Sequence, residues 1–157
     1  MEVIGVKISE TKDSKDIFED IECFREQTET FVQIFDHSKV VSKDHLLWAH
    51  QKAEENFEEK TNRADNIEIE TLLWSSGEWQ IKDAIDKMGI EDRDRRAVVL
   101  LDSSPQKFID FMSWERDDSI LEVSEEKLKA FGIDEKEIES VDSPEDLVFE
   151  KMATSIL

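Results

Sequence analysis

The sequence has 157 residues, of which 38% are hydrophobic and 38% are charged. It contains 40 acidic and 20 basic residues, and the resulting net charge of −20 repels phosphate at long range, which excludes a general affinity for nucleic acid. The longest apolar run, Ala97–Leu101, is far too short to span a membrane, and no segment resembles a signal peptide, so we expect a soluble, cytoplasmic protein.

Three strands are predicted. Residues 2–8 alternate between apolar and polar side chains, and residues 31–36 are predicted to form a second strand. Residues 96–102 are apolar on both faces, and such a strand is expected in the centre of a sheet.

The predicted helices occupy most of the remaining chain. The first opens at Asp13 or Ser14 and buries a stripe of Ile17, Ile21 and Phe24. Ser42 can cap a long helix that reaches about Lys60. The C-terminal third is predicted to contain helices only, at Pro105 to about Trp114, Ser124–Phe131 before Gly132, Asp134–Ser140 and Ser143–Ser155.

Residues 62–89 are predicted to form two helices that meet near one glycine. Asp65 and Glu68 fit a capping box at the start, and Gly77 fits a left-handed stop at the end of the first helix. The second helix should bury Ile81, Ala84, Ile85 and Met88 on one face and end at a left-handed Gly89. Residues 75–80 should then lie at the surface, where we expect function.

Together these elements predict a single α+β domain over residues 1–157. It should contain a small mixed or antiparallel sheet of three to four strands, covered by about seven helices.

The residues offer no recognisable catalytic arrangement. Four glycines are too few for a glycine-rich phosphate loop, and no serine, cysteine or lysine has an activating partner. His45 and His50 lie about 140° apart on a helix, so they cannot share a metal, and we interpret them as surface or core-edge residues. Cys23 is the single cysteine, which excludes an internal disulfide, and its thiol is expected to be buried. We therefore predict no catalytic residues, no metal and no cofactor.

Binding features are clearer in the middle of the chain. Trp48, Trp74 and Trp79 fall outside the apolar stripes of their helices, which favours an exposed partner surface, although each indole could also be wedged between two elements. Basic and amide side chains accompany them and suit phosphate contacts and hydrogen bonds to a single-stranded RNA end: Lys52, Lys60, Asn62, Arg63, Gln80 and Lys82. An ordinary solvated helix face would carry similar residues.

The middle third also resembles a known family. The pattern comprises an acidic residue in the first helix, a Ser-Gly turn and a following Gln-Ile, here Glu70, Leu72, Leu73, Ser76, Gly77, Gln80, Ile81, Ala84, Ile85 and Gly89. Upstream pieces are His45, Leu46, Ala49 and Asn62–Ala64, and a downstream piece is Ala97–Leu101. In this order they resemble the kinase-binding subunit of the KEOPS complex over about residues 31–101, with a looser similarity in residues 150–157.

The resemblance implies a non-catalytic regulatory subunit. Proteins of that family bind and stimulate the small atypical kinase/ATPase of KEOPS and contact the 3′ CCA end of tRNA, while another subunit installs the threonylcarbamoyl group on adenosine. By position, the tRNA end would meet Lys60, Asn62, Arg63, Ser76, Gly77 and Gln80, and we add the nearby Lys82. For the kinase, which needs an apolar and partly exposed face, we suggest Trp79, Ile90 and Met152. No membrane and no small-molecule substrate is implied.

Two other classes remain as alternatives. An acidic interaction module that imitates nucleic acid would make dispersed carboxylate contacts and bind no RNA, but the middle of the chain, with 10 basic and 14 acidic residues between 37 and 100, is only weakly acidic. A metal-dependent hydrolase would need a cluster of His, Asp and Glu, which the sequence does not display.

Overall fold

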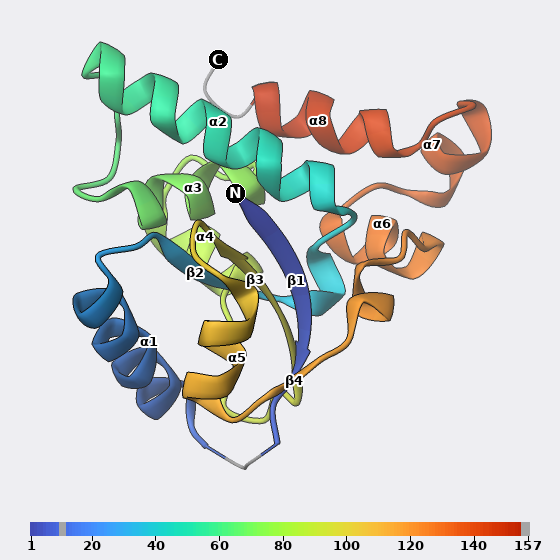
Figure 1. Ribbon diagram of the computed structural model, residues 1–157. Helices are drawn as coiled ribbons and strands as arrows, with labels where there is room; N and C mark the ends of the chain where they lie inside the picture. The colour runs from blue at the N-terminus through green and yellow to red at the C-terminus, as the bar shows by residue number, and fades with distance from the viewer. Residues whose placement is uncertain (10–11, 155–157) are drawn as a thin grey trace. The chain divides into compact units, whose positions relative to one another are not determined.

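A computed structural model describes residues 1–9 and 12–154 (Figure 1). Within these ranges, four strands form one antiparallel sheet and are accompanied by eight α-helices, so the predicted α+β class is confirmed. The strands are β1 (Glu2–Lys7), β2 (Val32–Asp36), β3 (Arg96–Leu101) and β4 (Glu115–Arg116). The helices are α1 (Ser14–Thr28), α2 (Lys43–Glu59), α3 (Ile67–Ser76), α4 (Ile81–Met88), α5 (Pro105–Met112), α6 (Glu125–Phe131), α7 (Glu135–Ser140) and α8 (Glu145–Thr154), with 3-10 helices η1 (His37–Lys39) and η2 (Asp118–Leu121).

The chain forms two compact units. Residues 1–37 and 89–121 form the sheet unit, and residues 38–88 and 122–157 form the helical unit. The single domain over residues 1–157 stays a prediction. None of the helices in the described ranges has both the length and the apolar character that crossing a membrane requires.

In the sheet unit the strand order is β2-β3-β1-β4, with every neighbouring pair antiparallel. The predicted central strand is confirmed, because Val99 of β3 lies opposite both Ile4 of β1 and Ile34 of β2. Helices α1 and α5 lie side by side (Figure 1), and Phe24 and Phe108 meet edge to face with ring centroids 5.2 Å apart. Their apolar stripes and one face of the sheet form a single buried cluster.

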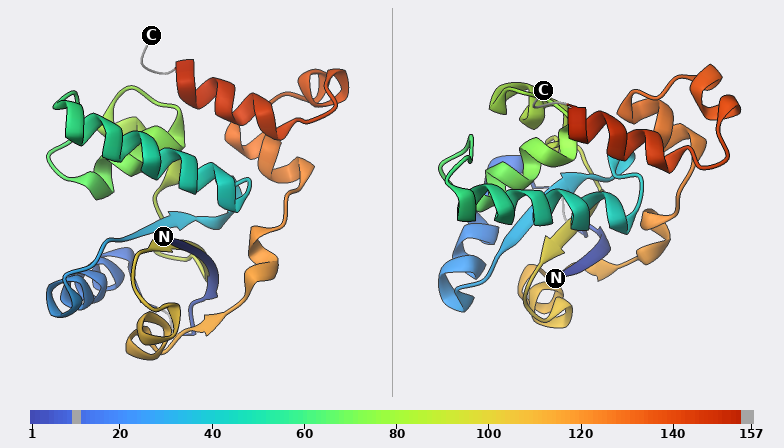
Figure 2. Two further views of the ribbon diagram at one scale, coloured as in Figure 1. Left: turned by 45° about the horizontal axis from the view of Figure 1, so that its top comes forward. Right: turned by 90° about the horizontal axis from the view of Figure 1, so that it is seen from above.

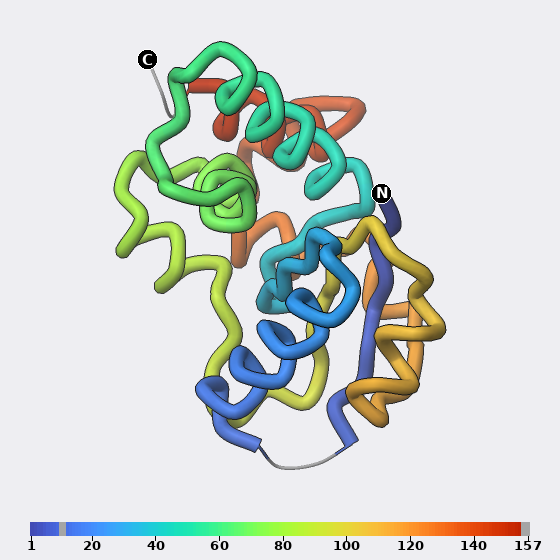
Figure 3. Tube along the Cα trace, turned by 60° about the vertical axis from the view of Figure 1, so that its left-hand side comes forward, coloured from blue at the N-terminus to red at the C-terminus, as the bar shows by residue number. Residues whose placement is uncertain are grey.

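The helical unit is built on α2 and α3, which pack closely together, and α8 lies alongside α2 (Figure 2). As predicted, Ser42 caps α2 by accepting a hydrogen bond from the backbone N–H of His45, and Lys60 ends the helix in the left-handed conformation. Ser42 also donates a hydrogen bond to Glu145 at the start of α8. Figure 3 follows the chain from α2 through residues 60–66 into α3 and then α4.

Several local predictions are wrong. The cap of α3 is Asn66, whose side chain accepts from the N–H of Ile69, and not the capping box of Asp65 and Glu68. Gly89 does not adopt a left-handed conformation, whereas Gly77 does, with φ of 70°. The thiol of Cys23 is exposed, because it lies outside the stripe of α1 that faces the core.

The prediction that the C-terminal third contains helices only is also wrong. It contains the short strand β4, which pairs with Val6 and Lys7 of β1. Both of its residues are charged and exposed, so they carry no alternation that sequence reasoning could detect. Helix α5 ends before Trp114, at a left-handed Ser113, and the predicted end of the last helix at Ser155 lies outside the described residues.

Gly5 lies where β1 meets η2. Its N–H donates to Oδ1 of Asp118 at 3.2 Å, and its carbonyl oxygen accepts from the N–H of Asp117 at 2.8 Å. A Cβ at this position would overlap the carbonyl oxygen of Asp117. The backbone can approach so closely only because Gly5 has no side chain.

We expect Gly5→Ala to lower the free energy of unfolding by about 1–3 kcal/mol, because β1 and η2 must move apart. Gly89→Ala is the matched control, since Gly89 has no left-handed backbone, and it should change stability by less than about 1 kcal/mol. Urea denaturation of both variants measures the difference. Equal stability of the two variants would contradict this account of Gly5.

Candidate functional site

The segment between α2 and α3 is tied to the segment between α3 and α4. Nη1 of Arg63 donates hydrogen bonds to the carbonyl oxygens of Glu78 and Trp79, at 3.3 and 3.2 Å. Residues 60–66 and residues 77–80 therefore form one continuous surface within the helical unit, which we call the loop–junction surface. It contains most of the residues that the sequence suggested for RNA.

A buried carboxylate holds this surface together. Oε2 of Glu70 accepts the backbone N–H groups of Arg63 and Ala64, both at 2.8 Å, and Oε1 accepts from Nδ2 of Asn56 at 3.0 Å. Glu70 is fully buried, and Nε of Arg63 lies 4.0 Å from its Oε1. These donors replace the water that an ionised carboxylate would otherwise need. The loop is thereby fixed to α3.

The guanidinium of Arg63 lies between two indole rings. Its Cζ is 5.6 Å from the ring centroid of Trp74 and 5.1 Å from that of Trp79, which are cation–π distances. Burial lowers the pKa of Arg63, and the charge of Glu70 opposes this shift. Among the described residues, Nη2 of Arg63 and Nε1 of Trp74 have no hydrogen-bond partner. The two rings are therefore a large part of what surrounds this cation.

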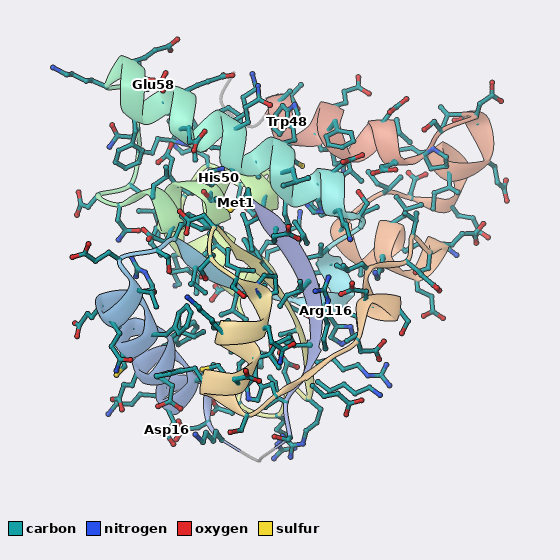
Figure 4. The ribbon with its side chains drawn as sticks, in the orientation of Figure 1. Met1, Asp16, Trp48, His50, Glu58 and Arg116 are labelled. Atoms are coloured by element: carbon teal, nitrogen blue, oxygen red, sulfur yellow. The ribbon has the colours of Figure 1, made fainter. Side chains whose placement is uncertain are left out.

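The three tryptophans differ from the prediction of a common exposed face. Trp74 is buried, because α3 is enclosed on all sides from Leu72 to Ser76. Trp48 of α2, labelled in Figure 4, is half-buried. Its ring contacts both Trp74 and Phe149 of α8, with centroids 5.7 and 6.1 Å apart. Only Trp79, with 58% of its surface exposed, is available to a partner as expected.

His45 connects the start of α2 to the end of α3. Its Nδ1 accepts the N–H of Val41 at 3.1 Å, so the proton of the neutral ring is on Nε2, which donates to the carbonyl oxygen of Ser75 at 2.7 Å. The ring also meets Phe131 edge to face at 5.1 Å. Burial lowers the pKa of His45 from 6.5 to about 4. The side chain belongs to the core, not to the surface or core edge that the sequence suggested.

Some of the residues suggested for RNA are exposed, and the others are buried or occupied by contacts within the protein. Lys60, Asn62, Gln80 and Lys82 are exposed, whereas Gly77 is half-buried. The expectation that residues 75–80 all lie at the surface is wrong, because Ser75 and Ser76 are completely buried. Ser76 uses its hydroxyl to donate to the carbonyl oxygen of Leu73 and to accept from the N–H of Glu78. Arg63 is mostly occupied by the contacts above.

The apolar edge suggested for the kinase is likewise not exposed as expected. Ile90 is buried in the core of the sheet unit, and Met152 of α8 is completely buried in the helical unit. On α4, Ala84 and Met88 point inward, but Ile81 and Ile85 are 39% and 46% exposed, which corrects the predicted apolar face. The sequence-based prediction placed all four residues on one apolar face and missed this exposed pair. Grouping residues four apart would have separated Ile81 and Ile85 from Ala84 and Met88.

In the described part of the chain, no group of three or more His, Cys, Asp or Glu side chains is placed to hold a metal ion. The geometry offers instead an ordered aromatic and cationic surface on a rigid support.

We expect Glu70→Gln to lower the free energy of unfolding by about 2–4 kcal/mol, because an amide nitrogen would face backbone donors that are already buried. Glu58→Gln, at the exposed end of α2 (Figure 4), is the matched control and should change stability by less than about 0.5 kcal/mol. Urea denaturation measures both. A similar small change in the two variants would show that Glu70 does not hold the loop.

The low pKa of His45 makes stability depend on pH. Well above pH 6.5 the ring is neutral in both the folded and the unfolded chain. As the pH falls from 6.5 towards 4, only the unfolded chain takes up the proton, so stability is lost in this range, by about 2 kcal/mol at pH 5. NMR should find no titration of the His45 ring between pH 8 and 5, and a midpoint near 6.5 would refute its burial in the neutral form.

Comparison with known proteins agrees with the resemblance found in the middle third. No curated protein sequence matches the chain. A family model described as kinase binding protein CGI-121 matches residues 6–155, a range that contains the loop–junction surface and the strands β2, β3 and β4. The chain belongs to the CGI-121 family of kinase-binding proteins.

Proposed function

We propose that this chain is a non-catalytic subunit of the KEOPS complex that modifies tRNA with threonylcarbamoyladenosine. In this role it binds and stimulates the small atypical kinase/ATPase of the complex and helps to recruit tRNA through its 3′ CCA end. Membership of a kinase-binding family is the observation that carries the proposal. The tRNA contact and the assignment to KEOPS go beyond this membership, and they are supported by the sequence resemblance of the middle third of the chain.

For the kinase, the best-supported surface is the outer side of the junction and of α4. Trp79, Ile81 and Ile85 are large apolar side chains that remain exposed, and the last two are four residues apart on one helix face. Exposed aromatic side chains commonly dominate the affinity of protein interfaces. Trp79 is also held in place by the guanidinium of Arg63, which reduces the entropy lost on binding.

For the RNA end, the exposed polar side chains of the loop–junction surface are the best candidates. Lys60, together with Lys82 just beyond this surface on α4, can contact phosphates, and the amides of Asn62 and Gln80 can bond to base edges. Arg63 is better suited to supporting this surface than to meeting RNA, so a change at Arg63 would alter stability as well as binding. Because the whole protein carries a charge of −20, we expect binding to be weak without the kinase and to decrease with salt.

An acidic interaction module without RNA affinity is the alternative, favoured by the excess of 40 acidic over 20 basic residues. The two proposals differ in what accompanies the protein in cells. A tagged chain should be purified from the cells that produce it naturally, at low salt, followed by mass spectrometry of bound proteins and sequencing of bound RNA. Recovery of a small kinase together with tRNA supports the proposed role, and a kinase without tRNA supports the alternative. Recovery of neither would refute the assignment to KEOPS.

We expect Trp79→Ala to weaken binding of the co-purified kinase by about 30-fold or more, as for other interface residues of this type. Phe18→Ala on α1 is the matched control, because it removes another aromatic side chain that is 45% exposed. Biolayer interferometry with the purified kinase measures both affinities. Equal affinities of the two variants would exclude Trp79 from the kinase interface.

A further inference from the structure

Lys87, at the end of α4, has an unusual environment for a lysine in the helical unit. Its side chain is only 20% exposed, and its Nζ lies 3.9 Å from the centroid of the Phe131 ring, a close cation–π contact. Nζ of Lys87 forms an ion pair with Oε1 of Glu78. The two atoms are 3.9 Å apart, which is too far for a hydrogen bond. Within the described ranges the ammonium group therefore makes this ion pair but no hydrogen bond, although it has three donors.

Two further lysines act on the same position. Burial lowers the pKa of Lys87, Glu78 opposes this, and the positive charges of Lys151 and Lys39 lower it further. Lys151 uses one donor for the carbonyl oxygen of Gly132, at 2.6 Å. Nζ of Lys87 lies on the ring of Phe131, and Nζ of Lys151 bonds to the carbonyl oxygen of the next residue, Gly132, so these two ammonium groups lie near each other. Their mutual repulsion favours the binding of an anion beside them.

The lysines adjoin the loop–junction surface. Glu78, the carboxylate beside Lys87, belongs to the junction between Gly77 and Trp79. A Cβ built on Gly77 would lie 3.6 Å from the carbonyl oxygen of Lys151 and 3.8 Å from the Phe131 ring. The cationic cluster and the junction are therefore in direct contact within one unit.

We infer that Lys87 and Lys151 form a phosphate-binding site that holds a backbone phosphate of the RNA end bound at the loop–junction surface. This inference rests on the proposed RNA contact and adds residues to it. Lysine suits the task because its ammonium is a compact point charge that needs no fixed bidentate geometry. The Phe131 ring orients Lys87, whose unused donors are then available to phosphate oxygens.

The test measures binding of a tRNA acceptor-stem RNA ending in CCA across salt concentrations. We expect Lys87→Gln to weaken binding about tenfold at low salt and to reduce the slope of log K against log salt by about 0.7, the value for one lost phosphate contact to single-stranded RNA. Glu78→Gln should strengthen RNA binding, because it removes the negative charge beside Lys87. Lys151→Gln is a second variant at an exposed position that is expected to fold.

Lys136→Gln on α7 is the matched control, since it changes the net charge equally but its charge does not act on Lys87. The inference is overturned if all three variants, Lys87→Gln, Lys151→Gln and Lys136→Gln, bind RNA with the same affinity and the same slope of log K against log salt. The proposed RNA contact would then remain intact. If the wild-type protein binds no RNA, the proposed RNA contact fails, and the site is judged with pyrophosphate alone. Thermal stabilisation by pyrophosphate that disappears in Lys87→Gln then supports an anion site for a free phosphate compound, and no stabilisation refutes it.

Discussion

A carboxylate that is removed from water needs several donors, and Glu70 obtains them from the backbone of Arg63 and Ala64 and from the amide of Asn56. Through these bonds one side chain of α3 determines where the preceding loop runs. That loop places Arg63 between the rings of Trp74 and Trp79 and against the carbonyl oxygens of the junction. The exposed indole of Trp79 and the polar side chains around it thus depend on a group that never reaches the surface.

The charges of the protein follow two different patterns. Most acidic side chains are dispersed and exposed, where water screens them and their mutual repulsion is small. In the helical unit, by contrast, basic side chains meet aromatic rings: Lys52 with Trp48, Arg63 with two indoles and Lys87 with Phe131. An aromatic face attracts a cation without adding a formal negative charge, so these positions keep their positive potential. Local anion recognition and a strongly negative net charge are then compatible.

Sequence reasoning located the elements well wherever a local signal decides them. Ser42 and Lys60 bound α2 as predicted, and the continuous apolar run of β3 correctly indicated a central strand. It failed where tertiary contacts decide. Ser76 and Trp74 look polar or amphipathic in sequence but are enclosed by neighbouring helices, and Glu115 and Arg116 become a strand only because β1 offers a partner. For the site, Glu70 was recognised only through a family pattern, because its role depends on donors that lie six to fourteen residues away in sequence.

The position of β3 in the chain also has a consequence for the order of folding. β1 and β2 both bond to β3, and the other partner of β1 is β4, so every strand pair in the described ranges requires residues beyond Arg95. The intervening residues 38–88 belong to the helical unit, which includes the closely packed pair α2 and α3. During synthesis, helices can therefore form and pair locally while the first two strands still lack a neighbour. Closure of the sheet waits for β3 to emerge, so the earliest part of the chain is among the last to acquire its native backbone bonds.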